Sequence, residues 1–369
     1  MQVSEAQRGG FSPHSVRLAW ILALAYLLVI VHASLQPYRG WRAPPDEILR
    51  FLAAPWPRYI TPGDIIVNLA AYVPLGFLLS VGCGARRGAG FGVFLAALCA
   101  AGLSLAMESV QMFLPARIAS NVDLLANCLG ALIGAMAAPL FAPTRILGGK
   151  LHAARHRLFV EGMAADVALV IACLWLVTQF HPTAQLFGTG GIRATFDLPA
   201  YFVHAPQTAL TFEAAVVLLN LLGTGLMIAA FMRGDPRHLL AIGAVIGSAL
   251  LIKTAAAALI RTTAPLAWLT PGVTLGLLAG WLLLYGAVRL PQTAKLAVAA
   301  LCIVLATVAI NLAPGNPYQS VPLKLIAGGA SHFLSFSGIV RALSELWPLL
   351  SVGFLTYALA GRAAAIRYN

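Results

Sequence analysis

Ten apolar runs, each about as long as one membrane-crossing helix, dominate this sequence of 369 residues. An α-helix rises about 1.5 Å per residue and the hydrocarbon core of a bilayer is about 30 Å thick, so about twenty apolar residues cross it. The runs cover residues 16–35, 64–82, 89–110, 122–141, 163–182, 211–232, 238–260, 268–288, 295–313 and 343–361. The pattern predicts an all-α, polytopic helical membrane protein with about ten transmembrane helices.

The composition agrees with this prediction. Hydrophobic residues make up 60% of the chain, charged residues make up 10%, and the mean hydropathy is +0.85. Soluble domains carry about 25% charged residues, and a chain this apolar cannot cover itself with a polar surface in water. A soluble enzyme, a disordered chain and a coiled coil are therefore excluded.

The charged residues indicate how the chain is oriented. The net charge of +12 would suggest nucleic acid in a soluble protein, but here Lys and Arg cluster in the loops between apolar runs. Topology determinants are placed in this way. We therefore expect membrane lipids as partners and no nucleic acid. The side that holds both termini carries more Lys and Arg than the other side, which predicts that both termini lie in the cytoplasm.

The basic stretch at 145–157 is the best domain boundary in the sequence. It predicts a first membrane domain over 1–142, a cytoplasmic linker over 143–160, and a second membrane domain of about six helices over 161–369. The segment 323–337 is apolar but short and rich in Gly and Ser, so we expect it to be interfacial or re-entrant.

Signatures of cofactor and metal chemistry are missing from the sequence. The five cysteines form no CxxC pair, and the sequence has no P-loop, HExxH motif or serine nucleophile elbow. We expect no cofactor and no metal site.

Polar residues gather where the first four runs meet the outer surface. The second run begins with an acid and an amide, the third ends with such a pair, the fourth begins with another, and an arginine lies in the loop before the fourth. These seven residues are Asp64, Asn68, Glu108, Gln111, Arg117, Asp123 and Asn127. Ionisable groups at membrane depth are costly and are functional candidates by default.

Spacing places these residues on shared helix faces. Asp64 and Asn68 are four residues apart, as are Asp123 and Asn127, and each pair therefore shares one face. Arg117 is suited to bidentate contact with a carboxylate or phosphate. A structural interpretation stays open, because both aspartates can cap helix N-termini and the arginine can pair with an acid to lock its loop.

The ordered motifs resemble a known family. The run D-x-x-x-N-x-x-x-x-x-P-x-G includes Pro74 and Gly76, E-x-x-Q-x-x-x-P-x-R follows from Glu108, and D-x-x-x-N-x-x-G ends at Gly130. Over about residues 15–142 the chain resembles the VanZ-like family of bacterial membrane proteins. The resemblance implies a four-helix unit in the bacterial cytoplasmic (inner) membrane and a link to the cell envelope and to resistance against the glycopeptide teicoplanin. It supplies no mechanism. Family members commonly carry an acid between the arginine and the last motif, where this chain has I-A-S-N-V.

Three functions are open for this cluster. We favour binding or handling of an envelope lipid or glycolipid head group, with Arg117 and the amides as its contacts. A scaffold for an envelope assembly is the second. The third is a membrane-embedded enzyme with Glu108 or Asp123 as general base; catalytic residues are otherwise unknown, and we lean against catalysis.

The second half has two candidate ion pairs. Arg341 and Glu345 are four residues apart on one run and are expected to pair. Glu213 and Lys253 fall in the outer halves of neighbouring runs, and an intramembrane pair between them would offset two costly charges.

Overall fold

The computed structural model describes residues 11–367 except 12, 36–39, 45–46, 57–61, 116, 182–183, 194–198, 200, 203–204, 235–237, 261–264 and 315–330. Across these residues the regular elements are all helical, no strand forms, and an isolated bridge joins Phe159 to Met232. The predicted all-α fold is therefore confirmed. Most of the predicted segment 323–337 lies outside the described residues.

Eight helices in the described part of the chain are long and apolar enough to cross a membrane. They are α1 (Pro13–Leu35), α2 (Pro62–Arg87), α3 (Ala89–Gln111), α4 (Asn121–Ala137) with the 3-10 helix η3 (Ala138–Phe141), α7 (Pro206–Ala230), α8 (His238–Ile260), α10 (Gln292–Leu312) and α12 (Ser331–Arg367). The protein is thus a multi-pass membrane protein.

Two predicted spans form shorter helices. Helices α6 (Met163–Thr178) and α9 (Pro271–Ala287) have 16 and 17 residues, about 24–26 Å at 1.5 Å per residue. Helix α6 stops early because the chain turns at Gln179, and α9 starts late because Pro271 occupies its first turn behind the N-cap Thr270. Apolarity therefore located these helices but overestimated their lengths.

The chain divides into two compact units. Unit 1 comprises Met1–Arg155 and Ala327–Ile339, and unit 2 comprises His156–Ile326 and Val340–Asn369. Helix α5 (Ile146–Leu158) contains the change from one unit to the other and coincides with the basic stretch of the sequence. The domain limits expected from the sequence, at 1–142, 143–160 and 161–369, stay a prediction.

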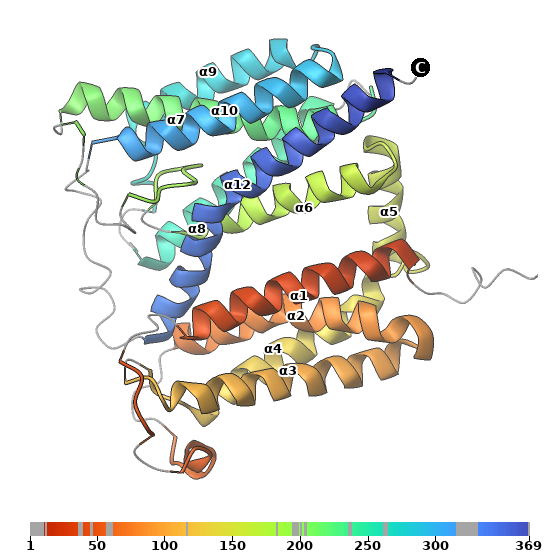
Figure 1. Ribbon diagram of the computed structural model, residues 1–369, viewed down its shortest axis with the longest axis vertical. Coiled ribbons are helices and arrows are strands. Elements are labelled where there is room, and N and C mark those ends of the chain that lie inside the picture. Colours follow the sequence, from red (N-terminus) through yellow and green to blue (C-terminus); the bar gives the residue numbers. More distant parts are fainter. Residues whose placement is uncertain are drawn as a thin grey trace, which may run out of the picture. The chain divides into compact units, whose positions relative to one another are not determined.

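Unit 1 is built around α2, which contacts α1, α3 and α4 (Figure 1). Glycines bring α2 and α4 close together. A Cβ atom added at Gly76, Gly130 or Gly134 would lie 1.9–2.0 Å from a backbone carbonyl oxygen of the facing helix. Only glycine permits this approach, as in other membrane helix pairs with small residues at the interface.

Helix α1 packs against α2 at a proline. Pro74 lies inside α2 and has no N–H for the carbonyl of Ala70 one turn earlier. The adjacent carbonyl of Ala71 accepts a hydrogen bond of 2.9 Å from the Tyr26 hydroxyl of α1. A polar side chain thus supports the α2 backbone beside the proline.

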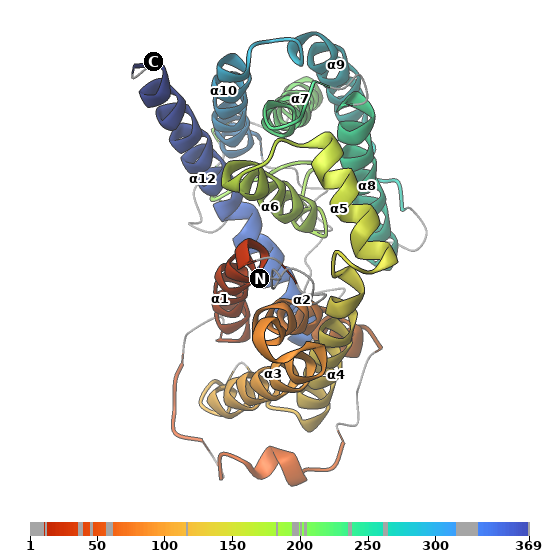
Figure 2. The same ribbon diagram turned by 90° about the vertical axis from the view of Figure 1, so that its right-hand side faces the viewer.

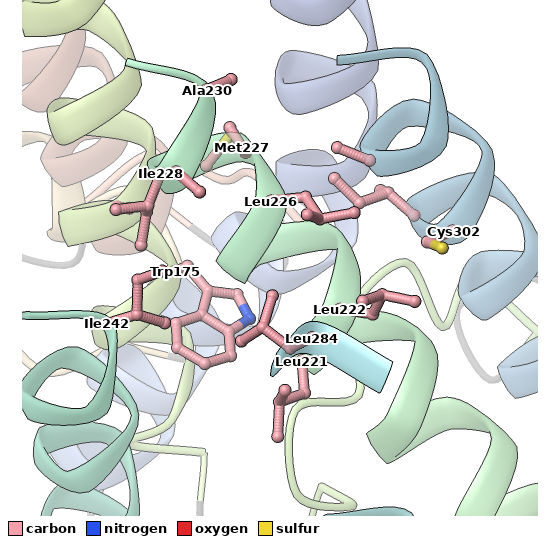
Figure 3. Packing of buried hydrophobic residues seen from close by; sticks show 14 of the residues in the cluster. Trp175, Leu221, Leu222, Leu226, Met227, Ile228, Ala230, Ile242, Leu284 and Cys302 are labelled. Atoms are coloured by element: carbon pink, nitrogen blue, oxygen red, sulfur yellow. The ribbon is translucent and has the colours of Figure 1, made fainter. Parts of the chain in front are cut away.

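Unit 2 has its own core around α7, which packs against α9 and α10. Figure 3 shows Trp175 of α6 in one apolar cluster with Leu221 and Met227 of α7. The buried indole of Trp347 in α12 donates a 2.9 Å hydrogen bond to the carbonyl of Ile171. Apolar packing and the hydrogen bond of the Trp347 indole therefore join α6, α7 and α12.

Residues 184–191, between α6 and α7, form a largely buried, non-helical segment. Leu186, Phe187 and Thr189 are almost fully buried, and Phe187 adopts a φ of 59°. The N–H of Phe187 donates to the side-chain carbonyl of Gln179, and that of Ile192 donates to Asn311 of α10. Polar side chains on neighbouring helices thus supply the partners that non-helical backbone needs in an apolar interior.

The expected ion pair between Glu213 and Lys253 does not form. The Lys253 ammonium donates to the carbonyls of His181 and Ala184 at 2.5 and 2.6 Å. The carboxylate of Glu213 instead accepts the Thr270 hydroxyl at 2.6 Å. Each charge finds a polar neighbour closer than the other charge, so the predicted pair was wrong.

The predicted pair within α12 is confirmed. The Nε atom of Arg341 lies 2.9 Å from a carboxylate oxygen of Glu345. Helix geometry alone places residues four apart on one face, so this contact needs no tertiary information.

Candidate functional site

Glu108 joins the end of α3 to the start of α4. It lies in the last turn of α3, and its side chain is 3% exposed. Its Oε2 atom accepts a 2.9 Å hydrogen bond from the backbone N–H of Ser120. Ser120 is the N-cap of α4, and its hydroxyl accepts from the N–H groups of Val122 and Asp123. A buried carboxylate and a helix cap thus fix the loop between the two helices.

Asp123 joins α4 to α2. Its Oδ1 atom accepts a 2.8 Å hydrogen bond from the side-chain amide of Asn68. Asp123 is buried, and Asn68 is partly buried. The carboxylate also lies in the first turn of α4, where the helix dipole favours negative charge.

Asn127 lies one turn further along α4 and forms a separate contact. Its amide donates a 2.9 Å hydrogen bond to the hydroxyl of Ser104 in α3, and both side chains are buried. Asn68 and Asn127 occupy matching positions in the repeated motif D-x-x-x-N, but they bind different partners. The asparagines of the two D-x-x-x-N motifs therefore make different contacts.

Arg117 and Gln111 both reach the C-terminal end of α1. A guanidinium nitrogen of Arg117 donates to the carbonyl of Ala33 at 3.0 Å, and the amide of Gln111 donates to that of Ser34 at 3.1 Å. Carbonyls in the last turn of a helix lack intrahelical partners and carry partial negative charge. The two side chains therefore cap α1 from the neighbouring helix and loop.

Two opposite effects act on the pKa of Arg117. Partial burial lowers the pKa of its guanidinium, and the nearby negative charge of Glu108 counteracts that shift. The group keeps its proton in either case, because arginine stays charged in proteins. A half-buried cation thus lies beside a buried acid.

Six of the seven predicted residues lie at one end of unit 1, where α1 and α3 end and α2 and α4 begin. They are Asn68, Glu108, Gln111, Arg117, Asp123 and Asn127. Asp64 belongs to the first turn of α2, but its side chain lies outside the described residues. Pro74, Gly76 and Gly130 lie further along the α2–α4 contact.

Sequence reasoning missed Ser120 and Ser104 as members of this network. Ser120 could have been found, because a serine just before an apolar run that starts N-V-D is a common N-cap pattern. Ser104 lies inside an apolar helix and carries no comparable signal. Only its position across from Asn127 identifies it.

Metal chemistry finds no support in the part of the chain that the structure describes. No group of three or more His, Cys, Asp or Glu residues is placed there to hold a metal ion. The polar end of unit 1 offers instead a guanidinium, amides and carboxylates, which suit hydrogen bonding to a polar ligand.

Comparison with known proteins relates the first part of the chain to a family. The family model described as VanZ/LLP1 matches residues 18–142. No curated protein and no solved structure matches the chain. The matched residues include most of α1, all of α2, α3 and α4, and the polar network described above. This family is linked to glycopeptide resistance. Residues 18–142 of this multi-pass membrane protein thus form a domain of the VanZ-like family.

Proposed function

We propose that the polar end of the VanZ-like domain binds the anionic head group of an envelope lipid or glycolipid. The observation that carries this proposal is the placement of Arg117. Its guanidinium is half-buried, anchored on the carbonyl of Ala33, and next to the buried Glu108. An arginine held in this way is preorganised for phosphate or carboxylate recognition, because its planar fork loses little freedom on binding.

The proposed location follows from charge distribution. We place the chain in the bacterial cytoplasmic membrane with both termini in the cytoplasm, because the loops on that side are richer in Lys and Arg. The polar end of unit 1 then faces the outside. Residues 1–142 form the binding domain, 143–160 the linker, and 161–369 a second membrane domain.

The decisive experiment compares two arginines by native mass spectrometry. Arg117→Ala removes the proposed ligand contact. Arg193→Ala is the matched control, because Arg193 also donates to a carbonyl at a helix end, that of Ala313. A charged hydrogen bond contributes about 1.5–3 kcal/mol, so Arg117→Ala should weaken binding roughly 10- to 100-fold.

The result we expect is a lipid with a phosphate or carboxylate head group on wild type and on Arg193→Ala, and its loss from Arg117→Ala. Equal lipid adducts on all three proteins would refute the proposal. Thermal unfolding of the same samples separates ligand loss from loss of fold.

The scaffold function has one observation in its favour. Glu108 binds the backbone of Ser120 and Asp123 binds Asn68, and both bonds hold helices of the domain together. If the network is purely structural, Glu108→Gln and Arg117→Ala both lower the melting temperature and no ligand is found. An enzyme would instead lose turnover and keep its fold with Glu108→Gln.

A further inference from the structure

The segment between α1 and α2 exposes a cluster of large apolar side chains. In the described residues 40–44 and 47–56, which include the 3-10 helix η2 (Arg50–Ala53), these are Trp41, Ile48, Leu49, Leu52 and Trp56. Trp56 is 71% exposed. Two tryptophans and three aliphatic side chains on one short segment would be a costly surface in water.

This segment is fastened to the polar end of unit 1. The N–H of Arg42 donates to the carbonyl of Phe113 at 3.0 Å, and the side-chain amide of Asn121 donates to the carbonyl of Ala54 at 2.7 Å. Phe51 is buried. The segment is therefore anchored on both sides of the loop that carries Arg117, and its remaining apolar side chains point outward.

Its position matches a membrane surface. The segment begins after α1 ends and finishes before α2 begins, so it belongs to the end of unit 1 where the spans stop. Helix η2 lies level with the end of α3, beyond α3 and α4 on the side away from α1 (Figures 1 and 2). It thus lies beside the helix ends, where a bilayer crossed by these helices would have its head groups.

The charges of the segment suit an anionic surface. Arg42 and Arg50 are exposed, and the sequence between the two helices, residues 36–61, holds four arginines against two acids, Asp46 and Glu47. Tryptophan prefers the membrane interface, and each basic residue near the surface strengthens attraction to anionic lipids. Apolar and basic side chains on one short element are typical of an interfacial segment.

We propose that residues 41–44 and 47–56 form an interfacial platform that binds anionic phospholipids of the leaflet at this end of unit 1. Trp41 and Trp56 insert at the boundary between head groups and acyl chains, and Arg42 and Arg50 bind lipid phosphates. The platform is a separate site from Arg117 and does not depend on the ligand proposed there.

The depth of the tryptophans can be measured by fluorine NMR. The full-length protein, labelled with fluorotryptophan, is placed in phosphatidylglycerol nanodiscs, and Trp41→Phe and Trp56→Phe assign the two signals. We expect a nitroxide in the acyl region to broaden both signals more than a water-soluble gadolinium chelate does. The buried Trp175 and Trp347 serve as internal controls that the chelate leaves unchanged.

Two results would overturn insertion. Stronger broadening by the chelate than by the lipid nitroxide would place the segment in water. Protection from both agents would show that protein, including a second copy of this chain, covers it.

Lipid choice is tested with head-group nitroxides on phosphatidylglycerol and phosphatidylcholine in mixed nanodiscs. The anionic label should broaden the Trp56 signal more, and the preference should fall about fivefold for each arginine in Arg42→Gln and Arg50→Gln. Lysine at both positions keeps the charge and should keep most of the preference. Equal broadening by both lipids in wild type would refute anionic-lipid binding. Circular dichroism and melting temperature show that the exposed substitutions leave the fold unchanged.

Discussion

The contact between α2 and α4 provides the sharpest prediction from this structure, through Gly130→Ala. The new Cβ atom would lie 2.0 Å from the carbonyl oxygen of Leu69, whereas real Cβ atoms essentially never approach closer than 3.0 Å. The obstacle is the Leu69 backbone, so no side chain can rotate away. The two helices must therefore separate by about 1 Å, the difference between these distances.

The cost has two parts. Inserting a methyl group into a well-packed contact costs about 1–3 kcal/mol, and alanine regains up to about 1 kcal/mol through its better helix propensity. The hydrogen bond from Asn68 to Asp123 crosses the same contact two turns away at 2.8 Å. A 1 Å separation stretches it beyond hydrogen-bond range, which costs about 1 kcal/mol more. We expect a net loss of roughly 1–4 kcal/mol.

The assay is SDS-induced unfolding of the purified protein in mixed micelles, with helix content as the signal. Gly102→Ala is the matched control, because Gly102 also lies inside a helix of unit 1 and its added Cβ would meet nothing within 4 Å. The control should match wild type or exceed it by up to about 1 kcal/mol. If Gly130→Ala proves as stable as Gly102→Ala, the close approach of α2 and α4 is wrong.

Three further changes test other parts of the structure by the same unfolding assay. Ser120→Ala removes the cap of α4 and should cost about 1 kcal/mol, while Ser120→Asp should restore most of it. Lys253→Met leaves two backbone carbonyls without their donor and should cost about 2 kcal/mol, with partial recovery in Lys253→Gln; a fully stable Met variant would contradict the contact. Burial, followed by the charges of Lys253 and Arg341, lowers the pKa of His181 to about 4 from its ordinary 6.5. The unfolded state therefore takes up a proton first, and stability should fall by up to about 3 kcal/mol as pH drops from 6.5 to 4. His181→Asn should flatten that slope, and an unchanged slope would disprove the assignment.

The sequence predicted the positions of the membrane helices but not their lengths. Apolarity located α6 and α9 correctly, because a long apolar segment has no stable alternative to a helix in a bilayer. Their ends depend on local contacts instead. The side chain of Gln179 accepts a hydrogen bond from the N–H of Phe187. This contact supports a turn at a position where the hydropathy predicts that the helix continues.

Within the candidate site, helix periodicity predicted which residues share a face but not which residues bind. Asn68 and Asn127 follow the same motif, yet one binds Asp123 and the other binds Ser104. The choice depends on which neighbouring helix lies opposite each turn. Glycines at the α2–α4 contact set that arrangement through backbone approach, which a single sequence reveals only as small residues.

The two ion pairs expected in the second half of the chain show which contacts the sequence determines and which the tertiary structure determines. The contact between Arg341 and Glu345 follows from the sequence alone, since the α-helix places residues four apart on one face whatever surrounds them. Lys253 and Glu213 lie on different helices, and there the tertiary structure decided. Lys253 meets the carbonyls of His181 and Ala184, and Glu213 meets the hydroxyl of Thr270. The physical reason is that local geometry is encoded in sequence spacing, whereas the partners of a buried charge depend on how separate helices pack around it.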